Sequence, residues 1–284
     1  MVAHPHSARP KTGYRERILT PQSSADMIES LIESLFPNQY SIQLGMGLLL
    51  LIVAEVGYRM GFRIPRKDDP ALQSEISGYQ AAVLGLLALL LGFTFSMALS
   101  HYDLRRSLVI QEANAIETTF LRTSFLPPES REASRKLLRD YLDLRMEYDK
   151  GSTAQAPILQ RTAFIQGELW KQGERAAINT PTPITATYIT ALNEMFDTAS
   201  TRIAASRVRV PSALWLILTT VSAFGIWAAG FSAGVNRKRA LFLTVGLPIL
   251  ITLVLQLITD ISTPKGGLIH TDYSSMVDLR ASIK

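Results

Sequence analysis

The sequence predicts an all-α membrane protein with four transmembrane helices and a helical extramembrane bundle between the second and third of them. Three observations support this fold class. Four long runs contain no charged residue, and the segment of roughly 110 residues between the second and third runs is polar with helical periodicity. No alternating strand pattern of useful length occurs in the sequence.

The four uncharged runs are long enough to cross a membrane. They cover residues 36–54, 76–100, 210–236 and 240–259. A helix rises about 1.5 Å per residue, so about 19 residues can cross a hydrocarbon core of about 30 Å. Soluble helices of this length usually carry charge on one face, and these runs do not. We therefore expect transmembrane helices at 36–62, 76–100, 210–236 and 240–260, in a multi-pass protein of the cell (inner) membrane.

The first 35 residues form a polar segment with two histidines and several basic residues but no apolar stretch of the kind that a signal peptide has. We therefore expect the first transmembrane helix to be a retained anchor. In the fourth run, Pro248 lies near the middle and predicts a kink, because proline removes a backbone hydrogen bond and clashes with the preceding turn.

The segment 101–209 is expected to form four helices. Its apolar residues recur at helical spacing in two stripes. The first stripe is Leu137, Tyr141, Leu144 and Tyr148, and the second is Tyr188, Leu192, Phe196, Ala199 and Ile203. Pro127 and Pro128, and the loops at 151–157 and 179–183, separate the helices.

The first of these helices is expected to continue from the second span, and the last to run into the third span at Pro211. Two long helices would then connect the bundle to the membrane. Such continuity could transmit movement between the two parts or could be purely structural. The remaining residues, 261–284, are expected to form a C-terminal tail.

The net charge of +5 and the pI near 9.5 come mainly from two short loops between spans. These loops hold Arg59, Arg63, Arg66 and Lys67 in one case and residues 237–239 in the other. Basic loops of this kind usually stay in the cytoplasm. The charge pattern therefore predicts an outward-facing bundle and gives no reason to expect nucleic acid as a partner.

Enzyme chemistry is not indicated. The chain has no cysteine, which excludes disulfides, thiolate metal sites and cysteine nucleophiles. It has no glycine-rich phosphate loop, no His-Glu-x-x-His motif and no nucleophile elbow. Composition alone leaves a Ser-His-Asp triad open. We expect a protein that is not an enzyme and has no cofactor and no metal site.

A few ionisable residues lie at the ends of the expected spans. Glu55 precedes Arg59 by one helical turn, which favours an ion pair. Asp260 ends the fourth span on the side where Arg105 and Arg106 leave the second, so an interfacial salt bridge is expected there. The alternative for such a group is a proton or ion relay.

Several segments in order resemble the bestrophin-like family of uncharacterised bacterial membrane proteins, which distantly resembles the bestrophin anion channels. These segments are "RRSLVIQEANAI", "FLRTSFLPP", "LNEMFDTASTRIAASRVRVPSALW" and "TDISTPKGGLI", and the resemblance covers most of residues 42–284. Bestrophins are pentameric channels with four spans and a cytoplasmic helical domain. The resemblance thus implies a cytoplasmic bundle, opposite to the charge pattern.

The stretch "LLGFTFSMALSHY" is similar to the bestrophin pore helix, in which apolar side chains one turn apart form a hydrophobic neck. Carried over, the neck positions fall on Gly85, Leu89 and Phe93. Only Phe93 keeps an aromatic ring, so a tight neck does not follow. The acidic clusters that bind calcium in animal bestrophins have no counterpart, and no calcium control is expected.

The leading hypothesis is therefore a homo-oligomer in the lipid bilayer that passes small anions through a pore lined by the second span. The alternative is a non-conducting sensor or scaffold that acts through its helical bundle. A membrane enzyme is the third and weakest hypothesis.

Overall fold

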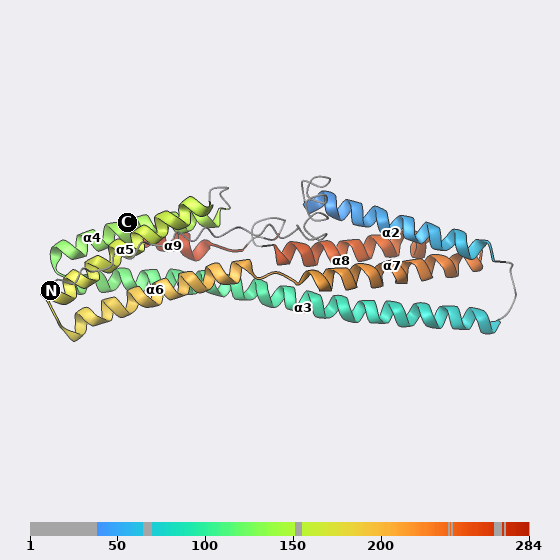
Figure 1. Ribbon diagram of the computed structural model, residues 1–284, viewed down its shortest axis with the longest axis horizontal. Helices are drawn as coiled ribbons and strands as arrows, with labels where there is room; N and C mark the ends of the chain where they lie inside the picture. The colour runs from blue at the N-terminus through green and yellow to red at the C-terminus, as the bar shows by residue number, and fades with distance from the viewer. Residues whose placement is uncertain are drawn as a thin grey trace, which may run out of the picture. The chain divides into compact units, whose positions relative to one another are not determined.

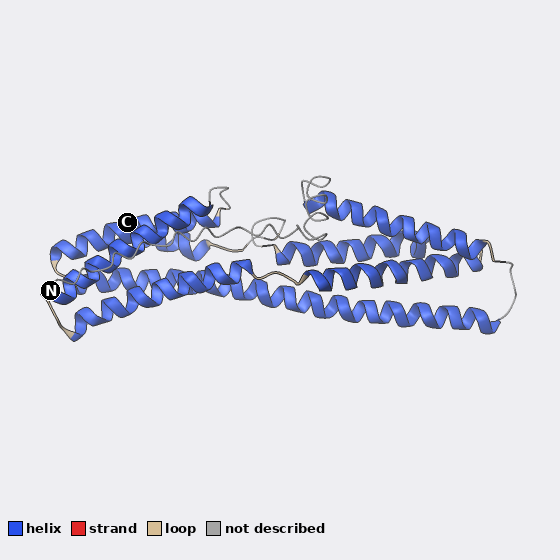
Figure 2. Ribbon diagram, viewed as in Figure 1, coloured by secondary structure: helices blue, strands red, loops and turns tan. Residues whose placement is uncertain are grey.

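The computed structural model describes residues 39–64, 70–150, 155–237, 239, 241–263, 269 and 271–283. The segment 1–35 and two basic residues of the first predicted basic loop, Arg66 and Lys67, lie outside the described residues. Within the described part the chain is helical and contains no strand (Figure 2). Residues Gln43–Lys284 form one compact unit, and the contacts described below all lie within it.

The helices follow one another with short connections. They are α2 (Gln39–Phe62), α3 (Pro70–Arg122), the 3-10 turn η1 (Thr123–Phe125), α4 (Pro128–Asp149), α5 (Gln155–Asn179), α6 (Pro183–Arg207), α7 (Ser212–Val235), the π turn η2 (Phe242–Gly246), α8 (Leu247–Ser262) and α9 (Ser274–Ser282). Among the described residues, four helical stretches are long and apolar enough to cross a membrane, and each overlaps one predicted span: Ser41–Phe62, Ser74–Phe125, Pro183–Val235 and Thr244–Ser262. The three helices expected after Pro128, after the 151–157 loop and after the 179–183 loop are α4, α5 and α6, but α5 begins at Gln155, inside the predicted 151–157 loop.

Helix α3 is continuous over 53 residues, which confirms the prediction that the second span runs on into the bundle. It packs against α7 and α8 in one part of its length and against α6 in another (Figure 1). The sequence allows this because no glycine or proline occurs between Gly92 and Pro127. The helix ends at Arg122, and Leu126 adopts the extended conformation that a following proline favours.

The predicted continuity of the last bundle helix with the third span is wrong. Helix α6 ends at Arg207, Val208 is extended with φ −70° and ψ 123°, and α7 begins at Ser212. Pro211 precedes α7 with φ −56° and ψ 139° and disfavours a helical conformation for the residue before it. Among the described helices, α3 is the one that packs as an unbroken helix against both α6 and the pair α7 and α8.

The unit contains two main apolar cores. We call the first the bundle core; its buried residues are Val109, Ala113, Ile116, Leu126, Leu138, Tyr141, Leu142, Leu169, Ala176, Tyr188, Leu192, Met195, Met276, Leu279 and Ile283. We call the second the span core; its buried residues are Leu50, Ala54, Leu87, Leu218, Ile226, Ile251 and Leu255. Tyr141, Tyr188 and Leu192, from the two predicted stripes, are fully buried in the bundle core, as expected.

Four glycines bring α2 and α7 into backbone contact. A Cβ added at Gly61 would lie 2.2 Å from the carbonyl oxygen of Phe231, and one added at Gly234 would lie 2.2 Å from that of Tyr58. Gly57 and Gly230, one turn away, meet the opposite backbone in the same way. Each helix thus presents a Gly-x-x-x-Gly pair, an arrangement that lets helices approach closely in membranes.

The expected disturbance at Pro248 takes the form of a π turn. The five residues of η2 directly precede α8, and Pro248 lies in the first turn of α8. A π turn widens the backbone by one residue, which makes room for a proline ring that would otherwise clash with the carbonyl four residues earlier.

The segment 261–284, predicted to be a tail, contributes a helix to the bundle. It contains α9, whose Met276 and Leu279 are buried in the bundle core. The Nε of Arg139 on α4 donates to the carbonyl oxygen of Ile283 at 2.7 Å. The bundle therefore includes a short fifth helix that follows α8.

Candidate functional site

One face of α3 has no neighbour in the described part of the chain. A Cβ added at Gly78, Gly85 or Gly92 would meet no atom of the described residues within 4 Å. Leu89 is 55% exposed and Phe93 is 66% exposed. Residues four apart share a face of a helix, so these positions line up along α3. We call this surface the open face.

The three predicted neck positions, Gly85, Leu89 and Phe93, all lie on the open face. The ring of Phe93 is exposed, whereas Thr94, the next residue, is buried. Two exposed serines, Ser96 and Ser100, continue the face toward the bundle. Within one copy of the chain, the open face therefore leaves apolar side chains without a partner from another described helix.

Beyond the apolar stretch the open face becomes polar and acidic. Asp103 and Asn114 are exposed on α3. A groove of about 420 Å³ lies between α3 and α6, and its lining includes Gln111, Glu194 and Asp197. The acidic residues give this part of the face a negative character.

The Glu55 carboxylate lies where the sequence predicted an interfacial ion pair. The Nε of Arg59 lies 2.8 Å from its Oε1, and the Nη2 of Arg239 lies 3.3 Å from the same oxygen. Arg239 also lies over the ring of Tyr58, with 4.7 Å between Cζ and the ring centroid. The cluster joins the end of α2 to the loop after α7. All three charged side chains remain substantially exposed, so each pair contributes little to stability.

The structure brings Arg105 to the end of α8, close to Asp260. Its Nη2 donates to the carbonyl oxygen of Ile261 at 2.6 Å. The Oδ2 of Asp260 accepts the backbone N–H of Ile269 at 2.9 Å and so fixes the chain that leaves α8. Arg106, the other predicted partner, is exposed. The expected Asp260 to arginine salt bridge stays a prediction.

A buried charge cluster, which sequence reasoning did not identify, joins three helices of the bundle. The Glu112 carboxylate on α3 accepts from Arg145 on α4, with Nε to Oε1 at 2.6 Å and Nη2 to Oε2 at 3.1 Å. It also accepts from Nη1 of Arg202 on α6 at 2.5 Å. The Nη2 of Arg202 donates in turn to Asp149, one turn after Arg145 on α4. The side chains of Glu112 and Arg145 are fully buried.

The two carboxylates of the cluster respond differently to burial. Burial alone would raise the pKa of Glu112, but the charges and hydrogen bonds of Arg145 and Arg202 together lower that pKa below its ordinary value. Burial raises the pKa of Asp149 despite its ion pair with Arg202. Glu112 is thus the better stabilised anion of the two.

A sequence signal for this cluster exists in the apolar stripes. Glu112 lies three residues after Val109, Arg145 lies four after Tyr141, and Arg202 lies three after Ala199. Each charged residue therefore occupies a position that faces the bundle core. A charge at such a position predicts a buried partner, although it does not say which one.

A sequence model of the bestrophin-like domain matches residues 48–276. Among solved structures the chain is similar to a bacterial bestrophin homologue from Klebsiella pneumoniae, at 15% sequence identity and a TM-score of 0.63, over 86% of this chain and 97% of that chain. A single-residue variant of a Klebsiella pneumoniae bestrophin homologue gives 15% identity and a TM-score of 0.62, over 85% of this chain and 96% of that one.

The structural likeness, at this level of identity, concerns the fold alone. No curated protein matches the chain by sequence. The domain match covers most of the chain and includes the later part of α2, all of α3, α7 and α8, the open face and the buried charge cluster. The chain therefore belongs to the bestrophin-like family.

Proposed function

We propose that this protein is an oligomeric membrane channel in which the open face of α3 lines a central pore. The observation that carries the proposal is the open face itself, where Leu89 and Phe93 have no partner helix in the described part of the chain. The characterised relatives of the family are anion channels, which supports a transport role.

A pore of this kind requires several copies of the chain. One helix cannot enclose a path, but a closed ring contributes one α3 from each copy around an axis. The small residues Gly78, Gly85 and Gly92 would keep the ring wide or permit close contact between neighbours. Leu89 and Phe93 would form an apolar constriction that closes by dewetting rather than by a charged gate.

The ion that passes is proposed to be a small anion, as in the characterised relatives. The acidic groups along the polar part of the face, Asp103, Glu194 and Asp197, favour the alternative of a small cation. A measurement of flux must therefore include both chloride and sodium.

The test uses purified protein reconstituted in liposomes, with its native mass measured in mild detergent. We expect the native mass to correspond to a closed ring of several copies and the liposomes to show a measurable ion flux. The Phe93→Ala variant should widen the constriction and raise the flux without changing the mass. The matched control is Phe224→Ala, which removes an exposed ring from α7 and should leave the flux unchanged.

Equal flux in the wild type and the Phe93→Ala variant would count against Phe93 as the constriction. A monomeric or dimeric mass, or liposomes without ion flux, would argue against the channel. The alternative would then be a non-conducting sensor or scaffold. The observation that favours this alternative is the continuity of α3, because one rigid helix belongs to both the span core and the bundle.

The bundle is proposed to lie outside the membrane, on the side opposite to the basic loops. By the charge rule, a reporter that is active only in the cytoplasm should work when fused after Arg66 and fail when fused after Gly151. The reverse pattern would place the bundle in the cytoplasm, as the family resemblance implies. Either result is compatible with a pore along α3.

A further inference from the structure

The Arg105 side chain is a buried cation with unused donors. Only 5% of the residue is exposed. Its Nη2 donates to the carbonyl oxygen of Ile261, but its Nε and Nη1 find no acceptor among the described residues. A buried charged group without partners is costly, and such groups usually indicate a bound ion or an ordered water. Burial also lowers the pKa of Arg105.

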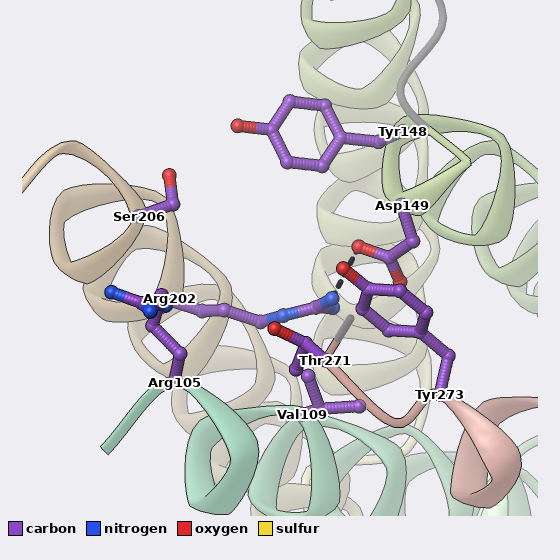
Figure 3. A pocket seen from close by; sticks show the side chains of 8 residues that line it. All are labelled: Arg105, Val109, Tyr148, Asp149, Arg202, Ser206, Thr271 and Tyr273. Atoms are coloured by element: carbon purple, nitrogen blue, oxygen red, sulfur yellow. Dashed lines mark hydrogen bonds and ion pairs between the residues drawn. The ribbon is translucent and has the colours of Figure 1, made fainter. Parts of the chain in front are cut away.

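Arg105 lines a cavity of about 30 Å³ at the base of the bundle (Figure 3). In Figure 3, Arg202 extends from α6 toward Asp149, Arg105 enters from α3, and Tyr273 lies beside Asp149. Thr271 and Tyr273 belong to the segment that precedes α9. Three bundle helices and the C-terminal segment therefore meet around this small space.

The charged side chains that line the cavity are Arg105, Arg202 and Asp149, so the lining carries one more positive than negative charge; Asp260, whose Oδ2 accepts the backbone N–H of Ile269, is not part of the lining. Arg145 and Arg202 are matched by Glu112 and Asp149, so these four groups sum to zero. Arg105 adds one cation, and its recorded hydrogen bond is to a neutral carbonyl. The free oxygen of Asp149, Oδ2, would repel an anion at its own end of the cavity, so an anion would bind nearest to Arg105.

We propose that this cavity binds one small monovalent anion of halide size. The cavity exceeds the about 10–15 Å³ that one water requires, so it has room for one halide ion. The Nε and Nη1 of Arg105 supply two charge-assisted donors. The hydroxyl groups of Thr271 and Tyr273 supply further donors from the segment that links α8 to α9. The bound anion thereby holds this segment against the bundle.

The test measures the thermal midpoint of the full-length protein in mild detergent. Sodium bromide is exchanged for sodium gluconate at constant ionic strength. We expect a saturable rise of the midpoint with bromide, because a ligand that binds only the folded state stabilises it. The Arg105→Gln variant should lose the bromide-dependent rise. The matched control is Arg106→Gln, which removes an exposed neighbouring charge and should keep the rise.

A second variant keeps the proposal testable if Arg105→Gln does not fold. The Thr271→Val variant removes one hydroxyl donor and should raise the half-saturating bromide concentration about fivefold. Crystals grown with bromide should show an anomalous peak beside Arg105. Equal midpoints in bromide and gluconate, or an Arg105→Gln variant that responds as the wild type does, would overturn the proposal.

The experiment is independent of conduction. It records binding in detergent rather than flux across a bilayer, so a protein that proves not to be a channel can still bind the anion. Conversely, if the protein conducts ions but its thermal midpoint does not respond to bromide, only the proposed anion site is wrong.

Discussion

The span core and the bundle core are packed against the same helix in different ways. In the span core, α2 and α7 meet through glycines whose missing side chains allow backbone contact. In the bundle core, α3, α4 and α6 meet through a buried carboxylate that binds two guanidinium groups. Apolar helices in lipid gain little from the hydrophobic effect, so close fit decides which helices pair. In the bundle, where burial alone is not selective, paired charges can fix which helix faces meet.

The largest expected effect follows from removal of the central carboxylate of the bundle. The Glu112→Gln variant leaves Arg145 and Arg202 buried without their shared counter-charge. We expect a loss of about 3–5 kcal/mol in the free energy of unfolding, measured by thermal or chemical unfolding in detergent. The control is Glu117→Gln on the exposed side of α3, which should have little effect. Similar losses in both variants would show that the buried cluster does not specify the bundle.

The next effect concerns the fit of the span core. The Gly234→Ala variant places a Cβ 2.2 Å from the backbone carbonyl of Tyr58, and backbone cannot easily move away. We expect a destabilisation of about 1–3 kcal/mol, as in other overpacked interiors. The control is Gly85→Ala on the open face, where added bulk meets no described atom and alanine favours the helix. If Gly85→Ala lowers the native mass instead, copies of the chain pack along this face.

A smaller effect should appear as a dependence of stability on pH. Since the pKa of Glu112 is lowered in the folded state, its contribution is present above its unfolded value of about 4.3 and is lost as the pH falls below it. The raised pKa of Asp149 has the opposite sign, so its contribution decreases as the pH rises through its titration. The charged groups that face these two are Arg145 and Arg202.

We therefore expect the thermal midpoint of the wild type to decrease as the pH is lowered below about 4.3. The Asp149→Asn variant should retain that acid-side fall, because Glu112 is still present. In the Glu112→Gln variant the fall should be reduced. If the profiles of the wild type and the Glu112→Gln variant have the same shape, the titration of Glu112 does not contribute.

The smallest effect separates a surface ion pair from buried apolar contact on the same helix. Arg280 on α9 binds Asp143 on α4 through two hydrogen bonds, at 2.5 and 3.0 Å, but both side chains are substantially exposed. The Arg280→Ala variant should cost at most about 1 kcal/mol. The Met276→Ala variant, in the buried face of the same helix, should cost about 2–5 kcal/mol. A larger loss for Arg280→Ala would mean that charge, rather than apolar contact, attaches α9 to the bundle.

The parts of the fold that the sequence predicted depend on periodicity within one helix. The stripe through Tyr141 and Tyr148, the proline boundary at Pro128 and the length of the apolar runs are local properties, and the structure has helices where they predict them. The open face was partly predicted, because the spacing of Leu89 and Phe93 places them on one side of α3.

The remaining features depend on which helices become neighbours. Glu112 pairs with residues 33 and 90 positions away in the sequence, and spacing along one helix cannot identify them. The glycines of α2 allow close backbone contact only because they lie opposite α7, and the sequence of α2 alone does not identify that partner. The short α9 has too few residues for a clear period, and its burial depends on a space that the other helices leave. The break before α7 follows from a local signal, because Pro211 disfavours a helical conformation of the residue before it.

Because α3 is unbroken, the angle about its axis between the open face and the charge cluster is fixed. Each residue of a helix turns the chain by about 100°, since 3.6 residues complete a turn. One residue inserted between Ser100 and Arg105 would therefore turn Phe93 by about 100° relative to Glu112, whereas four inserted residues would return it to within about 40°. The four residues between α6 and α7 impose no such angular relation. The orientation of the open face relative to the charge cluster thus depends on the number of α3 residues between them.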